Sequence, residues 1–126
     1  MFIVAVDYDG TLYEESSLEE TGVPRNDVVA KVRDCMDSEN CEIILWTCRT
    51  GEYLAEAVNN CKELGIFFDA VNNHSPSTIK RIKSGDLSGN SRKIHADIYV
   101  DDKAPGSIDL FLQIDINETA RNFENR

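Results

Sequence analysis

Acidic side chains gather in two short stretches of this sequence, at positions where they could hold a metal ion. Asp7 and Asp9 follow one apolar run, and Asp101 and Asp102 follow another. Carboxylates that crowd together repel one another, so four of them converge only where a positive charge holds them. A hard divalent cation prefers oxygen ligands, and Mg²⁺ fits best when a phosphate completes its coordination shell. The four aspartates therefore predict a magnesium site.

A third polar stretch, Thr47-Cys48-Arg49-Thr50-Gly51, closes the apolar run of residues 42–47. Taken one at a time, the acidic residues could be helix caps and turn residues that happen to be charged. An acidic pair, a threonine and a second acidic pair at three strand ends, in this order, favour one shared site instead. Arg49 could clamp a substrate phosphate with two hydrogen bonds, or pair with a surface glutamate.

The elements that would position these residues alternate between strand-like and helix-like patterns. Continuous apolar runs are typical of strands buried on both faces, and apolar residues at helical spacing indicate the helices between them. The expected strands span residues 2–6, 42–47, 66–71 and 96–100, and the expected helices span residues 27–38, 52–64 and 76–83. This alternation predicts the α/β class, with a Rossmann-like parallel sheet and helices on both faces. In such a sheet the ligand lies beyond the carboxyl ends of the strands.

A length of 126 residues and an apolar content of 41% predict one domain with its own core. The apolar runs are too short to span a bilayer, and the first residues lack the pattern of a signal peptide. The apolar stretch at residues 110–116 is of uncertain type. Residues 114–126 could form a flexible tail.

The net charge of −10 argues against nucleic acid and anionic membranes as partners, because both require Lys and Arg to neutralise phosphates. Four cysteines lack the spacing of a zinc site and the density of a disulfide-stapled scaffold. We therefore expect reduced thiols in a cytoplasmic protein.

The stretch Asp7-Tyr8-Asp9-Gly10-Thr11-Leu12 resembles the D-x-D-G-T-L signature of the haloacid-dehalogenase-like (HAD) hydrolase superfamily. Later motifs occur in the right order over nearly the whole chain. Thr47 resembles the Thr or Ser at the end of the second core strand, Lys93 the lysine before the last motif, and Asp101-Asp102 the closing acidic pair. The chain is most similar to small phosphatase-like members without a cap domain. This resemblance implies the HAD fold and Mg²⁺-dependent hydrolysis of a small or larger phosphomonoester.

The resemblance also implies catalytic roles. Asp7 would attack phosphorus and form an aspartyl-phosphate, and Asp9 would protonate the leaving oxygen and then activate water. The superfamily's dehalogenases lack an acid at the second position and its ATPases carry Thr there, so Asp9 favours a phosphatase. Thr47 would donate its hydroxyl to a phosphoryl oxygen. Lys93 would add positive charge, a role for which Lys80, Lys83 and Lys103 compete.

The same resemblance implies the ligands of the metal and the border of the substrate. Mg²⁺ would be held by the Asp7 side chain, the Asp9 carbonyl oxygen and Asp101, with Asp102 binding directly or through water. The substrate would be bordered by the Tyr8 backbone N–H, Gly10, Cys48 and Arg49.

Two other functions stay open. A phosphoacceptor receiver domain has similar length and an acidic pair after its first strand, but it needs an acceptor Asp near residue 50, where this chain has Thr47-Cys48-Arg49. The second alternative is a HAD fold that serves only as a binding or structural module. It would carry the same residues as the enzyme, so only an activity assay distinguishes the two. No gap between the expected elements is long enough for a lid domain, so the site should be open. A homo-oligomer or a bulky substrate would then exclude water from it.

Overall fold

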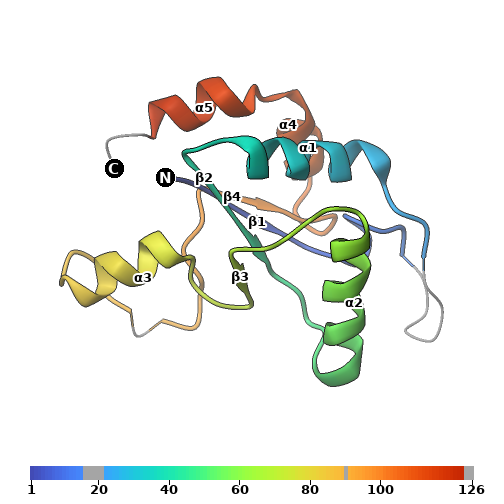
Figure 1. The fold of residues 1–126 in the computed structure, drawn as a ribbon, viewed down its shortest axis with the longest axis horizontal. Helices are drawn as coiled ribbons and strands as arrows, with labels where there is room; N and C mark the ends of the chain where they lie inside the picture. Colours follow the sequence, from blue (N-terminus) through green and yellow to red (C-terminus); the bar gives the residue numbers. More distant parts are fainter. Residues whose placement is uncertain (16–21, 90, 124–126) are drawn as a thin grey trace.

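Four parallel strands form the sheet on which the rest of the chain packs (Figure 1). The computed structural model of this chain describes residues 1–15, 22–89 and 91–123. The strands are β1 (Phe2–Val6), β2 (Cys41–Leu45), β3 (Ala70–Val71) and β4 (Ile98–Val100). Their order across the sheet is β3-β2-β1-β4, so the first strand lies inside the sheet with a partner on each side.

The central strand β1 is buried along its whole length, as its unbroken apolar run predicts. It pairs with β2 from Phe2↔Cys41 to Val6↔Leu45, and with β4 from Val4↔Ile98 to Val6↔Val100. Because side chains alternate between the two faces of a strand, each face receives part of this apolar run. The sheet therefore needs cover on both sides.

Helices provide that cover unequally on the two faces. The helices are α1 (Asn26–Asp37), α2 (Gly51–Glu63), α3 (Pro76–Lys83), α4 (Ser107–Gln113) and α5 (Ile116–Asn122). The larger core joins one face of the sheet to buried residues of α1, α2, α4 and α5. On the other face, Ser77 of α3 donates its backbone N–H and its hydroxyl to the carboxylate of Glu42, which is paired with Ile3. The predicted α/β class, with a parallel sheet and helices on both faces, is confirmed.

Two strands are shorter than the sequence predicts, and an aspartate explains each case. The strand expected from residue 66 begins only at Ala70, as β3. Just before it, the Asp69 carboxylate accepts the Ile43 N–H at 2.7 Å, and the Asp69 N–H donates to the Ile43 carbonyl at 2.9 Å. Asp97 does the same with Ile3, at 2.8 Å for both bonds, before β4. In both places a carboxylate oxygen replaces a backbone carbonyl as the acceptor.

The apolar stretch of uncertain type, residues 110–116, contains the end of α4 and the first residue of α5. The expected tail beyond residue 114 contains α5, whose Ile116 and Ala120 are buried against the core. Phe123 lies against Phe2 with ring centroids 5.3 Å apart, which places the two ends of the described chain together (Figure 1). Residues 124–126 of that tail lie outside the described residues.

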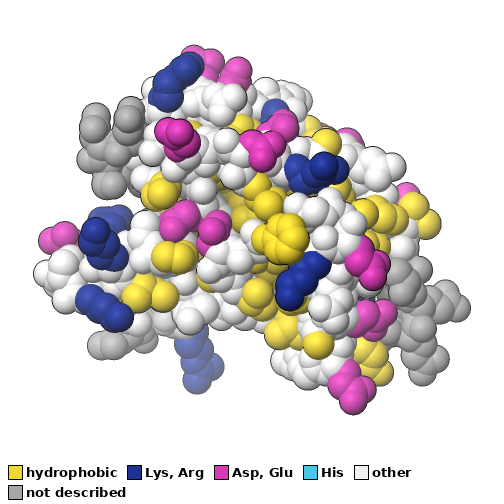
Figure 2. Space-filling model, viewed as in Figure 1, with side chains coloured by type: hydrophobic (Ala, Val, Ile, Leu, Met, Phe, Trp, Pro, Cys, Tyr) yellow, Lys and Arg dark blue, Asp and Glu magenta, His cyan; other side chains and the backbone are white. Residues whose placement is uncertain are grey.

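Charge is unevenly spread over the surface. Acidic side chains are scattered widely over the face in Figure 2, whereas basic side chains group over α3, which carries Lys80, Arg81 and Lys83. In the described part of the chain, none of the helices combines the length and the apolar character that crossing a membrane demands.

The packing of the core predicts that two neighbouring residues of α4 contribute very differently to the free energy of unfolding. Phe111 is fully buried, whereas Leu110 is 55% exposed. We expect Phe111→Ala to lower the free energy of unfolding by about 3–5 kcal/mol, because it removes a buried ring and leaves a cavity. The control, Leu110→Ala, should cost less than about 1 kcal/mol. Urea unfolding followed by circular dichroism measures both, and equal losses would contradict this packing.

Candidate active site

The site lies where the strand order reverses. Strands β1, β2 and β3 follow one another toward one edge of the sheet, and the chain then returns to place β4 on the other side of β1. At such a switch point the loops after the two neighbouring strands diverge and leave a crevice for a ligand. Asp7 follows β1 and Asp101 follows β4, and the Asp7 N–H still donates to the Val100 carbonyl at 2.9 Å. The parallel pairing of β1 and β4 thus sets these aspartates side by side.

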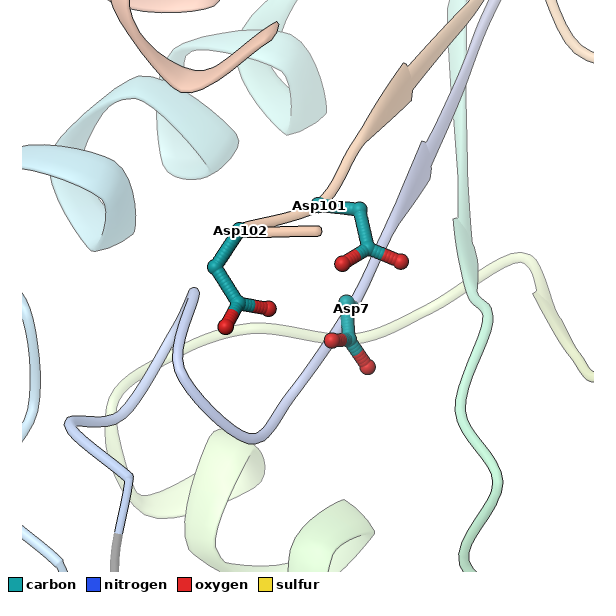
Figure 3. A group of neighbouring side chains, drawn as sticks. All are labelled: Asp7, Asp101 and Asp102. Carbon is teal, nitrogen blue, oxygen red and sulfur yellow. The ribbon is translucent and has the colours of Figure 1, made fainter. Parts of the chain in front are cut away.

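Asp7, Asp101 and Asp102 form a cluster of carboxylates at the ends of these two strands (Figure 3). One oxygen from each of the three lies within 4.8 Å of the others. Such a set of hard oxygen ligands has the chemistry that a divalent cation requires. The expected convergence of these three aspartates is therefore present, although Asp9 does not belong to the cluster.

Burial raises the pKa of Asp7 from its usual 3.8 to about 7, and the charges of Asp101, Asp102 and Asp9 add to this effect. The hydrogen bond that Asp7 Oδ1 accepts from the Tyr8 N–H, at 2.8 Å, opposes the shift. A bound cation would remove most of the cost of ionising Asp7, because it would neutralise the repulsion between the carboxylates. The residues present therefore fit Mg²⁺.

The loop after β1 is folded tightly against the loop after β4. The Tyr8 carbonyl accepts the N–H groups of Thr11, Leu12 and Tyr13 at 3.1–3.3 Å. Gly10 makes this turn possible with a φ of +81°, and a Cβ there would overlap the carboxylate of Asp102. Thr11 is completely buried, and its Oγ1 accepts the Asp102 N–H at 3.0 Å. The turn at residues 8–13 is therefore held by its own hydrogen bonds, and through Thr11 it also fixes the position of Asp102.

Arg49 holds Asp9, an arrangement that the sequence analysis did not predict. The guanidinium donates from Nε and Nη2 to the two Asp9 oxygens, both at 2.8 Å, and from Nη1 to the Tyr53 carbonyl at 3.2 Å. The Tyr8 ring lies 4.6 Å below the guanidinium. Arg49 is only 8% exposed, and its partner is Asp9 instead of the surface glutamate that the sequence offered as one alternative. The clamp on a substrate phosphate stays a prediction.

Tyr8 places its ring in the core, and the expected role of its backbone N–H at the substrate stays a prediction. The ring is buried and stacks on Tyr13 with centroids 4.7 Å apart. Its hydroxyl accepts a hydrogen bond from Asn60 of α2 at 3.0 Å. Asn60 therefore ties α2 to the loop after β1, a role for which the helical pattern carries no signal.

Thr47 is positioned by Asn72, a second residue that sequence reasoning missed. The Thr47 N–H donates to Asn72 Oδ1 at 2.8 Å, and Thr47 Oγ1 accepts the Arg49 N–H at 3.2 Å. Asn72 has a φ of +50°, a conformation in which Asn is enriched relative to most other residues. An Asn directly after a short apolar strand was the available signal. Cys48, between Thr47 and Arg49, is exposed.

Two lysines, Lys93 and Lys103, bear on the predicted catalytic role of a lysine. Lys93 is exposed, and its Nζ lies 5.4 Å from the centroid of the Tyr99 ring. No hydrogen bond or ion pair found within the described residues joins it to Asp7. Among the competing lysines, Lys103 contacts the cluster, with its Nζ 3.8 Å from Asp102 Oδ2. Lys93 in the catalytic role therefore stays a prediction.

No family model matches this chain, and neither does any curated protein. The chain is similar to a solved structure, that of a conserved protein from Bacteroides thetaiotaomicron. The two sequences are 29% identical, and the superposition has a TM-score of 0.67 over 98% of this chain and 89% of the other. This likeness supports the fold and assigns no activity.

The close approach of Gly10 to Asp102 predicts a specific effect on metal binding. Gly10→Ala should displace the Asp102 carboxylate and weaken Mg²⁺ binding roughly 10–100-fold, as changes beside metal ligands commonly do. The control is Gly85→Ala, because Gly85 has a φ of +85° but nothing within 4 Å of an added Cβ. Calorimetric titration with Mg²⁺ measures the two affinities. Equal affinities would mean that Asp102 takes no part in binding.

The raised pKa of Asp7 predicts how stability depends on pH in the absence of metal. The unfolded chain loses this proton near pH 4, whereas the folded chain keeps it to about pH 7, so the contribution of Asp7 to stability falls as pH rises through this window. In EDTA, wild type should lose stability between pH 5 and pH 8 relative to Asp7→Asn, and Mg²⁺ should reverse the loss. Urea unfolding at both pH values tests this, and parallel profiles would refute it.

Proposed function

We propose that this protein is a Mg²⁺-dependent phosphomonoesterase of the HAD type, with Asp7 as the nucleophile. One observation carries the proposal: Asp7, the first residue of the D-x-D-G-T stretch, shares one cluster with Asp101 and Asp102 at the switch point of the sheet. A structural role does not account for it, because crowded carboxylates oppose folding unless a cation joins them. Asp7, the Asp9 carbonyl, Asp101 and Asp102 would hold Mg²⁺, which would polarise the phosphoryl group and neutralise its charge.

In the first step, an Asp7 carboxylate oxygen attacks phosphorus while the bond from phosphorus to the leaving oxygen breaks. The product is an aspartyl-phosphate, and the leaving alcohol takes a proton from Asp9. In the second step, Asp9 accepts a proton from water as the water oxygen attacks phosphorus. Inorganic phosphate departs and the Asp7 carboxylate is restored.

Asp9 can take part only after its pair with Arg49 loosens, because both of its oxygens accept hydrogen bonds from the guanidinium. A substrate phosphate offers the same fork of two acceptor oxygens to an arginine. Exchange of Arg49 from Asp9 to the substrate would release Asp9 when a phosphate is present. The clamp expected from the sequence then belongs to the substrate-bound state.

Thr47 and the turn after Asp7 would surround the phosphoryl oxygens. The Thr47 hydroxyl accepts the Arg49 N–H, which leaves its own hydrogen available for a substrate oxygen. The Tyr8 N–H, which donates to Asp7 Oδ1 in this structure, would border the phosphoryl group together with Gly10 and Cys48. A lysine, either Lys93 or its competitor Lys103, would add positive charge. The substrate is a phosphorylated small molecule or a larger phosphomonoester, and a homo-oligomer stays one way to cover the open site.

Of the alternatives, the receiver domain is disfavoured by topology. Receiver-type doubly wound sheets have the order 2-1-3-4-5, whereas this sheet has the order 3-2-1-4. A binding module without activity shares every geometric feature described above. Only the assay separates it from the enzyme.

The decisive test compares wild type with Asp7→Asn. Wild type should release phosphate from a panel of phosphomonoesters with Mg²⁺ and not in excess EDTA. Asp7→Asn should lower turnover by several orders of magnitude, because a nearly isosteric amide is a poor nucleophile. Asp34→Asn, an exposed change on α1, is the control for charge. Turnover above about a tenth of wild type in Asp7→Asn, or full activity in EDTA, would refute the proposal.

The role of Asp9 predicts a dependence on the leaving group. Asp9→Asn should slow turnover roughly 10²–10⁴-fold for alkyl phosphates, the usual contribution of general acid–base catalysis. The defect should shrink for nitrophenyl phosphate, because a good leaving group needs little protonation. Steady-state rates on both substrates give the answer. A defect of equal size for both would exclude Asp9 as the acid.

A further inference from the structure

A cavity on the α3 side of the sheet has a lysine and both histidines of the chain in its lining. Its volume is about 310 Å³, within the range of small-molecule sites. Its polar lining consists of His74, Ser88, Ser91, Lys93, His95 and Tyr99. Neither the catalytic carboxylates nor the pair of Arg49 and Asp9 lines it.

The lining contains no carboxylate, although the chain has 23 acidic residues and a net charge of −10. Four other cavities on the described surface each include at least one, from Asp86 in the cavity beside α3 to Glu63 in the cavity beside α1. Repulsion opposes an anion in the two of them where carboxylates outnumber cations, whereas Lys80 and Arg81 accompany Asp86 in the cavity beside α3. In this cavity an ammonium and two imidazoles face an approaching anion instead.

The two imidazoles offer groups that a ligand could engage. His74 Nδ1 accepts the His95 N–H at 3.1 Å, so the hydrogen of a neutral His74 ring is carried on Nε2. His95 Nε2 is buried and, among the described residues, is the side-chain nitrogen or oxygen found without a hydrogen-bond partner. A buried polar atom without a partner is costly, so a ligand or water that binds it gains free energy. These are the chain's two histidines.

The cavity lies within reach of the carboxylate cluster. Tyr99, in its lining, precedes Asp101 by two residues and shares its side of β4, a separation of about 7 Å along the strand. His74 follows β3 at the same end of the sheet as Asp7. A ligand with two anionic groups could therefore place one at the metal site and the other in the cavity.

We propose that this cavity binds a phosphoryl or carboxylate group, and that this group is the second anionic group of the substrate. Here Lys93 supplies its charge to the second anionic group instead of to the phosphoryl group at Asp7, and His74, His95 and the serine hydroxyls supply hydrogen bonds. The assignment to a substrate rests on the proposed phosphatase function, whereas anion binding by the cavity does not. The substrate class is thus a phosphomonoester that carries a second phosphate or a carboxylate.

The first experiment measures binding without catalysis. The histidine ring signals are followed by NMR while inorganic phosphate is added to the full chain in EDTA, at constant pH. We expect saturable shifts of both rings, which chloride at equal ionic strength does not reproduce. Lys93→Met should weaken binding by roughly tenfold or more, because it removes a charge-assisted contact. Lys80→Met, the same change at an exposed lysine outside this cavity, should leave the affinity unchanged.

Unmoved histidine signals would overturn the proposal, and so would equal affinity in wild type and Lys93→Met. This experiment does not depend on hydrolysis. If no phosphomonoester is hydrolysed, the proposed function fails while the anion site is still judged by its own result.

The second experiment identifies the source of the anion. Wild type should show a higher kcat/KM for phosphomonoesters with a second anionic group than for matched neutral ones. His74→Asn keeps an acceptor for the His95 N–H but removes the ring donor, and it should reduce this preference, chiefly through KM. Absence of any preference in wild type would overturn the assignment to the substrate, and phosphate binding would then mark the cavity as a site for a free anion.

Discussion

The repulsion among carboxylates at the ends of β1 and β4 is the constraint around which this structure is arranged. Parallel pairing forces Asp7 beside Asp101, and the bond from the Asp102 N–H to Thr11 brings a third carboxylate to the same place. Burial further disfavours the ionised form of Asp7 when no metal is bound, so the pKa of Asp7 rises to about 7. A fold that keeps such a cluster gains stability from any divalent cation that binds it.

The fourth acidic group of the site avoids this repulsion by a different route. Asp9 turns away from the cluster to Arg49, whose guanidinium is buried and held by the Tyr8 ring and the Tyr53 carbonyl. The negative charge of these aspartates can therefore be neutralised in two ways. The cluster of Asp7, Asp101 and Asp102 needs a cation from solution, whereas Asp9 is neutralised by Arg49 of the same chain. This separation of Asp7 from Asp9 would suit the proposed mechanism, in which Asp7 stays at the metal as nucleophile and Asp9 is released as acid and base.

Negative charge also shapes how a substrate could approach. An anionic phosphomonoester meets repulsion over most of a surface with net charge −10, so productive binding depends on the few places where cations are exposed. The proposed Mg²⁺ at the carboxylates would be one such place, and the cavity with Lys93 and both histidines would be another. Selectivity for a doubly anionic substrate would then follow from charge alone, without a lid domain.

The sequence by itself determined the class of the fold and three members of the acidic cluster, although it also placed the Asp9 carboxylate there. Short unbroken apolar runs followed by turn residues favour strands buried on both faces, and the turn residues mark where those strands end. Short edge strands were predicted too long, because the pattern does not show that Asp69 and Asp97 replace backbone acceptors. The partners of Arg49, Thr47 and Lys93 were decided only by tertiary structure. Each partner depends on how loops from distant strands meet: Asp9 lies 40 residues from Arg49, and Asn72 lies 25 from Thr47. Local pattern carries no information about such pairs, since the strand order and the crossovers that create them are properties of the whole sheet.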